Sequence, residues 1–138
     1  MAKLSPHLRF DDKKTREALN FYKDCFGGGE MTFQISAETP MAKDMSADMQ
    51  DSIMHATFKH GEIEFTASDM MRDKAVIGDN VVMALNCNSE EELRNIFSKL
   101  EKGGSVFMAP EKAFWGAIFG MVTDKYGVEW MLNFQIEK

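Results

Sequence analysis

The sequence predicts an α+β fold in which one order of elements, a strand, a helix and three strands, occurs twice along the chain. Two segments are helical in pattern, because each places apolar residues on one face at intervals of three and four residues. Both segments end at consecutive glycines, and each is preceded by one strand-like run and followed by three. A repeated order of elements defines an architecture more firmly than any single element does.

The first half begins with a strand-like run over residues 4–10. A helix is expected over residues 15–26, and its apolar face carries Ala18, Leu19, Tyr22, Cys25 and Phe26. The glycines at 27–29 end this helix, because glycine adopts the left-handed conformation at low cost. Three strands are then expected, at residues 31–36, 53–59 and 62–68, and the last two form a hairpin through His60-Gly61.

The second half repeats this order. A strand is expected over residues 81–87, and Ser89 and Glu92 have the spacing of a capping box at a helix start. The buried stripe of this helix is Leu93, Ile96, Phe97 and Leu100, and the helix ends at Lys102-Gly103-Gly104. Strands are expected over residues 106–109, 116–123 and 128–134, with a turn at residues 124–127.

Each half alone would leave one sheet face uncovered. We therefore expect two curved, mixed sheets that face each other around a cavity, where side chains from alternate strand positions meet a ligand. The chain is expected to be a single domain over residues 1–138, with module one at about residues 1–70, a linker at about 71–80 and module two at about 81–138.

Composition excludes several classes of protein. The 138 residues, of which 44% are hydrophobic and 28% charged, are typical of a globular domain. A net charge of −6 with scattered lysines argues against nucleic-acid binding. No apolar run approaches the ~20 residues of a membrane span, and the N-terminus lacks a signal-peptide pattern. Two cysteines, Cys25 and Cys87, are too few for a disulfide framework, so a cytoplasmic location is expected.

Residues 38–50 fit no strand pattern. Met41, Met45 and Met49 recur there at four-residue intervals. The spacing predicts a short mobile helix or lid whose methionines line a pocket. The alternative is that these methionines only fill gaps in the core, because methionine packs adaptably.

Several short pieces of the chain follow one another in a characteristic order. They are Pro6-His7-Leu8-Arg9-Phe10, residues 17–28, Ile53-Met54-His55-Ala56, Ala67-Ser68-Asp69, residues 100–104, Trp115-Gly116, Phe119-Gly120 and residues 124–130. In this order and spacing they resemble the PhnB-like branch of the vicinal oxygen chelate superfamily, which includes glyoxalases, bleomycin-resistance proteins and extradiol dioxygenases. The resemblance covers nearly the whole chain and implies the glyoxalase/bleomycin-resistance/dioxygenase fold.

The resemblance also implies where a metal would be bound. Superfamily members hold one divalent ion through side chains on the first and last strands of each half. By similarity to glyoxalase I, Glu64 matches a glutamate ligand, and His7 lies near the first-strand position. The matching positions in the second half fall at Val82 and at Trp130 or Met131, which cannot bind a hard divalent ion. We therefore expect no tightly bound metal, and at most a weakly held ion at Glu64 and His7.

The PhnB-like branch often carries a methyltransferase label for a quinone precursor. The sequence shows no glycine-rich turn from strand to helix of the kind that a dinucleotide or similar cofactor occupies. The superfamily fold is also not a methyltransferase fold. We therefore expect no cofactor and give the label no weight.

Three residues are candidates for acid–base chemistry. Glu64 is a candidate catalytic residue, because a carboxylate in an apolar cavity has a raised pKa suited to proton abstraction; the alternative is a solvated strand residue. His55 is the second catalytic candidate, with a structural histidine as the alternative. His7 is a candidate ligand-binding residue that would join them. Glu129 is interpreted as an ordinary surface residue.

Other residues are candidates for ligand contact without chemistry. Arg9 and Arg72 could neutralise an anionic ligand, although single arginines are usually solvated. Trp115, Phe119 and Trp130 are expected to form an aromatic wall for a planar or apolar ligand, and core packing is the alternative explanation.

The leading hypothesis is a PhnB-like protein that binds a small organic molecule, with lyase-, isomerase- or dioxygenase-type chemistry on an unknown substrate. The rival is a non-catalytic protein that sequesters a small molecule or drug, as bleomycin-resistance proteins do. A third reading is a structural module whose cavity is filled by Met and Phe. By the same resemblance, the chain is expected to form a homodimer.

Overall fold

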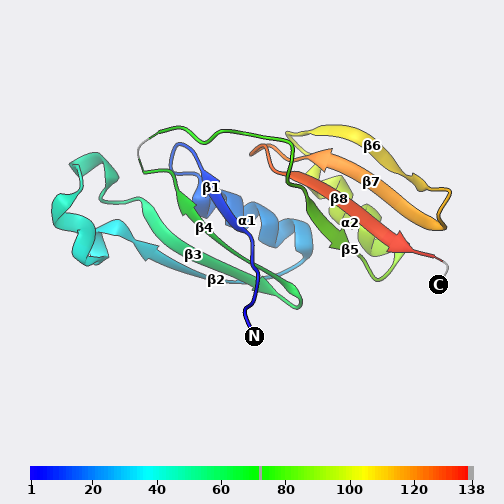
Figure 1. Ribbon diagram of the computed structural model, residues 1–138, viewed down its shortest axis with the longest axis horizontal. Helices are drawn as coiled ribbons and strands as arrows, with labels where there is room; N and C mark the ends of the chain where they lie inside the picture. The colour runs from blue at the N-terminus through cyan, green and yellow to red at the C-terminus, as the bar shows by residue number, and fades with distance from the viewer. Residues whose placement is uncertain (72, 137–138) are drawn as a thin grey trace. The chain divides into compact units, whose positions relative to one another are not determined.

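The computed structural model describes residues 1–71 and 73–136 (Figure 1). The chain divides into two compact units, Met1–Val76 and Ile77–Lys138. Each unit contains one four-stranded mixed sheet and one α-helix among its described residues. The predicted α+β class, with a strand, a helix and three strands in each half, is confirmed. No helix in the described part of the chain is long and apolar enough to cross a bilayer.

The first unit is built on a sheet with the strand order β1-β4-β3-β2. Strand β1 runs parallel to β4, whereas β4 pairs with β3 and β3 with β2 in antiparallel fashion. The elements are β1 (His7–Phe10), α1 (Thr15–Phe26), β2 (Glu30–Ile35), β3 (Ile53–His60) and β4 (Ile63–Asp69). The expected hairpin between β3 and β4 is present, with Gly61 at φ 60°.

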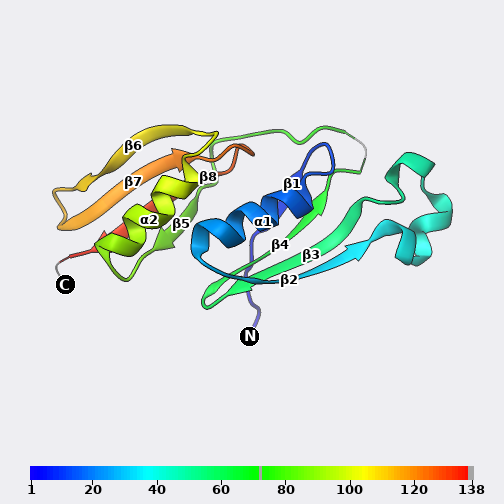
Figure 2. The ribbon, with the colours of Figure 1, turned by 180° about the vertical axis from the view of Figure 1, so that it is seen from behind.

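Helix α1 covers one face of the first sheet, as Figure 2 shows. The predicted apolar face is the buried one: Ala18, Leu19 and Tyr22 have no exposed surface. The Tyr22 ring meets Phe65 edge-on at 5.8 Å, and the Phe26 ring meets Phe58 at 6.0 Å. Because side chains alternate along a strand, the residues between these aromatic positions point to the opposite, uncovered face.

Asp69 connects the helix to the sheet in the first unit. Its side chain is 2% exposed, and it accepts hydrogen bonds from the backbone N–H groups of Thr15 (3.1 Å) and Ile53 (2.7 Å). Thr15 is the first residue of α1, and Ile53 is the first residue of β3. One carboxylate therefore satisfies a backbone N–H at the helix start and fixes the start of β3. No role was expected for Asp69 from the sequence.

The second unit repeats this plan with the strand order β5-β8-β7-β6. Strand β5 is parallel to β8, and the other pairings are antiparallel. The elements are β5 (Met83–Asn86), α2 (Glu90–Leu100), β6 (Ser105–Lys112), β7 (Ala117–Thr123) and β8 (Glu129–Gln135). The helix begins as predicted, because Ser89 Oγ accepts a hydrogen bond from the Glu92 N–H at 3.0 Å.

Helix α2 covers one face of the second sheet (Figure 2), and its buried residues are the predicted stripe of Leu93, Ile96, Phe97 and Leu100. Phe97 packs against Gly120, where an added Cβ would lie 2.9 Å from its ring. A larger side chain would push the helix off the sheet at this point. The face that contains Gly120 is therefore the covered face of the second sheet.

The segment between β2 and β3 is not the single short helix that the methionine spacing predicted. It forms three separate 3₁₀ turns, Ser36–Glu38, Pro40–Asp44 and Ala47–Met49. The last two turns contain no buried residue, and Met41 is 55% exposed. The alternative, in which these methionines fill core gaps, is also wrong for Met41.

Candidate functional site

The uncovered face of the first sheet gathers most of the residues that the sequence singled out. We call this surface the first open face. Two neighbouring rows cross the strands on this face, and all eight side chains in these rows are polar. The first row is His7, Thr66, Thr57 and Thr32. The second row is Arg9, Ser68, His55 and Gln34, in which Ser68 and His55 each lie one position beyond the pair of Ala67 and Ala56.

His7 is held in place by two hydroxyl groups on the neighbouring strand. Its Nδ1 lies 2.6 Å from Thr66 Oγ1 and its Nε2 lies 2.9 Å from Ser68 Oγ. A neutral imidazole donates to one of these hydroxyls and accepts from the other. The ring also stacks on that of His55, with centroids 6.3 Å apart. Partial burial, and then the nearby His55 and Arg9, lower the pKa of His7 from its ordinary 6.5.

Arg9 lies two residues beyond His7 on the same face, at a spacing of about 6.6 Å along the strand. It pairs in register with Ser68. Among the described residues, the Arg9 guanidinium makes no ion pair and no hydrogen bond, and Arg9 is exposed. Arg72, the other arginine considered as an anion partner, lies outside the described residues.

Glu64 lies on the same face, but the environment of its carboxylate differs from the expected apolar cavity. Its Oε2 lies 2.7 Å from Lys3 Nζ, and both side chains are exposed. The hydrogen bond and charge of Lys3 lower the pKa of Glu64 from 4.5, with a further contribution from Lys59. The expected raised pKa is wrong, because the carboxylate is solvated and paired with a cation rather than enclosed by apolar groups.

The donors on the first open face do not fit a resident metal ion. Both ring nitrogens of His7 contact hydroxyl groups, and Glu64 is paired with Lys3. Within residues 1–71 and 73–136, no group of three or more His, Cys, Asp and Glu side chains lies close enough to hold an ion. A site with only two protein donors would bind a divalent ion weakly.

The uncovered face of the second sheet, the second open face, has a different character. Register places Phe119 opposite Asn133 and Met121 opposite Met131 and Met108. The Phe119 ring meets Trp115 at 5.4 Å, and Trp115 is 46% exposed. Two of the three residues predicted for an aromatic wall therefore lie together.

Trp130, the third residue of that predicted wall, lies elsewhere. It pairs with Val122 and Met83. Trp130 lies three positions before Asn133, the partner of Phe119, and an odd separation along a strand puts two side chains on opposite faces. The Trp130 side chain therefore points to the face that α2 covers. Trp130 is 2% exposed, and its Nε1–H donates to Asp124 Oδ2 at 2.9 Å. The structure therefore places the Trp130 indole apart from Trp115 and Phe119, in the core of the second unit, where Trp130 also lines the hollow described below.

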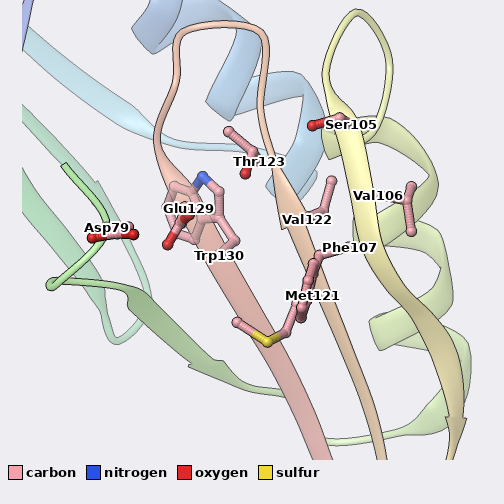
Figure 3. A pocket seen from close by; sticks show the side chains of 9 residues that line it. All are labelled: Asp79, Ser105, Val106, Phe107, Met121, Val122, Thr123, Glu129 and Trp130. Atoms are coloured by element: carbon pink, nitrogen blue, oxygen red, sulfur yellow. The ribbon is translucent and has the colours of Figure 1, made fainter. Parts of the chain in front are cut away.

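A hollow of about 360 Å³ lies at one end of the second sheet (Figure 3). Its lining combines hydroxyl, carboxylate and apolar groups, and comprises Asp79, Ser105, Val106, Phe107, Met121, Val122, Thr123, Glu129 and Trp130. Ser105, Thr123 and Glu129 are partners in register, so they form one row across the sheet. The sequence interpretation missed this hollow and treated Glu129 as an ordinary surface residue.

Thr66 and Ser68 were also missed as candidate site residues. The signal for them was present in the sequence, because β4 alternates strictly and places Glu64, Thr66 and Ser68 on one face. The contact of both hydroxyls with His7 depends on the parallel register of β1 and β4. That register joins segments almost sixty residues apart, which local patterns do not define.

The fold is shared with solved structures of a known class. A glyoxalase/bleomycin-resistance/dioxygenase family enzyme from Burkholderia phytofirmans has a similar structure, with a TM-score of 0.60 at 12% identity over 96% of this chain and 98% of that one. This likeness shows that the chain has the glyoxalase/bleomycin-resistance/dioxygenase fold.

Residues 2–133 match the model of the 3-demethylubiquinone-9 3-methyltransferase family, and the chain belongs to this PhnB-like family. It is 31% identical to Protein YjdN from Escherichia coli, over 94% of this chain and 93% of that protein. The PhnB protein from Bacillus cereus has a structure with a TM-score of 0.76 at 28% identity, covering 96% of this chain and 99% of that one.

Proposed function

We propose that the protein binds a small organic molecule at the first open face, and that residues 1–138 form a single domain. The module boundaries of this domain are those expected above, at about residues 70 and 80. One observation carries the proposal: His7, Arg9, His55 and Glu64 come from three strands and share a single polar face. A sheet that only covered a helix would not need two imidazoles and a guanidinium side by side.

The residues of this face have separate roles in the proposal. His7 and His55 transfer protons, because a neutral imidazole can both accept and donate near neutral pH. Arg9 orients the ligand. Glu64 is an ionised carboxylate beside Lys3 and can accept a hydrogen bond from the ligand. This set fits lyase- or isomerase-type chemistry, in which a proton moves between carbon or oxygen atoms of one substrate.

The dioxygenase-type reaction that the resemblance implied is the weaker part of the proposal, because the described donors do not form a metal-binding set. The methyl transfer in the family's name is not part of the proposal. The two connections from strand to helix, residues 11–14 and 87–89, contain no glycine and no phosphate-binding turn.

A screen of small organic molecules against the purified protein tests this proposal. Binding is followed by thermal shift, and each hit is measured again with His55→Gln and Glu64→Gln. Hits that need either side chain support the first open face as the site. Hits that bind both variants as tightly as the wild type would remove these two residues from the site.

The second open face favours a second candidate, a non-catalytic protein that sequesters an apolar molecule. Trp115, Phe119 and Met121 provide aromatic and thioether surface, and the hollow of about 360 Å³ lies on the same unit. A pocket of this size suits a small ligand. Hits that lose affinity in Trp115→Ala but keep it in His55→Gln would favour this candidate.

We also propose that the protein is a homodimer in the cytoplasm. Strand β6 lies at an edge of its sheet and exposes Val106 (42%), Phe107 (78%) and Met108 (44%). An exposed apolar edge strand is usually covered by a partner. Two buried cysteines, neither of them in a disulfide, agree with a reducing compartment. A single species near the monomer mass of 15.7 kDa in gel filtration would contradict the dimer.

A further inference from the structure

The two rows that contain His7 and Arg9 lack negative charge in a protein that is acidic overall. The chain has 22 Asp and Glu residues and a net charge of −6. Yet the two rows that contain His7 and Arg9 include no carboxylate. The ionisable groups in these rows are two imidazoles and one guanidinium. A surface of this kind is complementary to an anion.

The side chains in these rows also differ in how many hydrogen bonds they already make. Thr66 and Ser68 hold the His7 ring, and Thr32 Oγ1 lies 2.5 Å from Thr57 Oγ1. Among the described residues, Arg9 makes no ion pair or hydrogen bond, although its guanidinium carries five N–H donors in a planar fork. Such a fork matches the two oxygens of a carboxylate or phosphate group.

We propose that the ligand carries an oxyanion, a carboxylate or a phosphate group, and that Arg9, Ser68 and His55 bind it. This inference rests on the proposed function, because it names the chemical class of the molecule bound at the first open face. Arg9 donates two parallel N–H bonds, and His55 donates one ring N–H. The Ser68 hydroxyl completes the set.

His7 connects this anion site to the proton-transfer role. When the Nε2–H of His7 donates to Ser68 Oγ, the hydroxyl hydrogen of Ser68 is free to turn toward the anion. A protonated His7 donates to both Thr66 and Ser68 and enforces this arrangement. Anion binding and protonation of His7 therefore favour each other, as linkage requires.

The other charges around His7 do not oppose this site. The charged and titratable groups on this face of the four strands are Arg9, His55, Lys59, Glu64 and Glu30, and Lys3 lies before β1. Glu64 is four residues from Ser68 along β4, a distance of about 13 Å. Its charge is compensated by Lys3. Helix α1 lies on the opposite face of the sheet and places no charge beside His7.

The experiment uses the full chain with two probes, inorganic phosphate and acetate, at constant ionic strength. The chain has three histidines, so proton NMR of the imidazole C2–H signals reports on His7, His55 and His60 separately. His60 is the internal reference, because it lies in the β3–β4 hairpin next to Gly28 and away from both rows. Signals are assigned with His→Gln variants.

We expect at least one probe to shift the His7 and His55 signals in a saturable way while His60 changes little. Arg9→Gln should weaken this binding at least about tenfold, the effect of losing one charged hydrogen-bonding group. The matched control is Arg94→Gln, which removes the same charge from an exposed pair with Glu90 on α2 and should leave binding unchanged. Circular dichroism checks that each variant is folded.

The outcomes separate this inference from the proposed function. Tighter binding of phosphate or of acetate would identify which oxyanion the site prefers, and either result supports the inference. Unchanged anion binding in Arg9→Gln would overturn it. If neutral molecules from the screen shift His7 and His55 and neither anion does, the inference fails and the proposed function stands. If nothing shifts these two signals, both fail.

Discussion

The imidazole ring of His7 stacks on that of His55, with ring centroids 6.3 Å apart. The two histidines come from β1 and β3, with β4 between them. Partial burial, together with the proximity of His55 and Arg9, lowers the pKa of His7 from 6.5. The first open face therefore holds a neutral imidazole at neutral pH.

Replacing His7 with Gln should flatten the dependence of thermal stability on pH. Below pH 6.5 the unfolded chain takes up a proton at His7 more readily than the folded chain, so the wild type loses stability as the pH falls. Above this pH the residue contributes nothing. Melting temperatures measured from about pH 7.5 to about pH 5.5 should fall further in the wild type than in His7→Gln. Parallel curves would show that His7 titrates normally.

The ion pair between Lys3 and Glu64 predicts a change in the pKa of Glu64. In Lys3→Gln the pKa of the Glu64 carboxyl should rise toward its ordinary 4.5, because the hydrogen bond and the positive charge are both lost. High salt should have a similar effect on the wild type, since both side chains are exposed. NMR titration of the side-chain carboxyl carbon measures the value. An equal Glu64 pKa in the wild type and in Lys3→Gln would show that the carboxylate does not pair with Lys3.

Asp69 should be important for stability although it is not part of the proposed site. Asp69→Ala leaves the buried N–H groups of Thr15 and Ile53 without a partner, and we expect a loss of about 3 kcal/mol in the free energy of unfolding. Urea denaturation measures it. The control Asp44→Ala, at an exposed position, should change stability by less than about 0.5 kcal/mol. Equal losses of stability in the two variants would contradict the role of Asp69 as the partner of these two N–H groups.

The two tryptophans should respond in opposite ways. Trp130→Phe removes the N–H donor to the buried Asp124, so we expect a loss of about 1–3 kcal/mol in the free energy of unfolding and no specific loss of ligand affinity. Trp115→Ala changes a half-exposed side chain and should affect stability less. An ordering in which Trp115 is the more important for stability would show that the faces of β7 and β8 have been assigned wrongly.

The helices could be predicted from the sequence because their buried stripes repeat at the helical period and their ends carry local signals. Both α1 and the Ser89 cap of α2 agree with the expectation. The predicted start of β1 was less accurate, since the strand was expected from residue 4 and the observed one begins at His7. Pro6 has no backbone N–H to donate to a sheet, although its carbonyl accepts from the Thr66 N–H.

The features that were missed depend on partners far away in the sequence. In β8, Trp130, Met131 and Leu132 are all apolar, so alternation alone cannot show which of them faces α2. The partner of Glu64 is Lys3, which is about sixty residues earlier in the sequence, and no local pattern identifies this pair. For the same reason, the polar rows of the first open face became visible only once the pairing of β1 with β4 was known.

Chemical-shift mapping of a bound ligand tests the central claim most directly. The best hit from the organic-molecule screen is titrated into isotope-labelled protein, and the backbone and histidine signals are followed. We predict that the largest changes occur at His7, Arg9, His55 and Ser68, which lie together on the first open face. Changes confined to residues 105–130 of the second unit, with these four signals unmoved, would contradict the account.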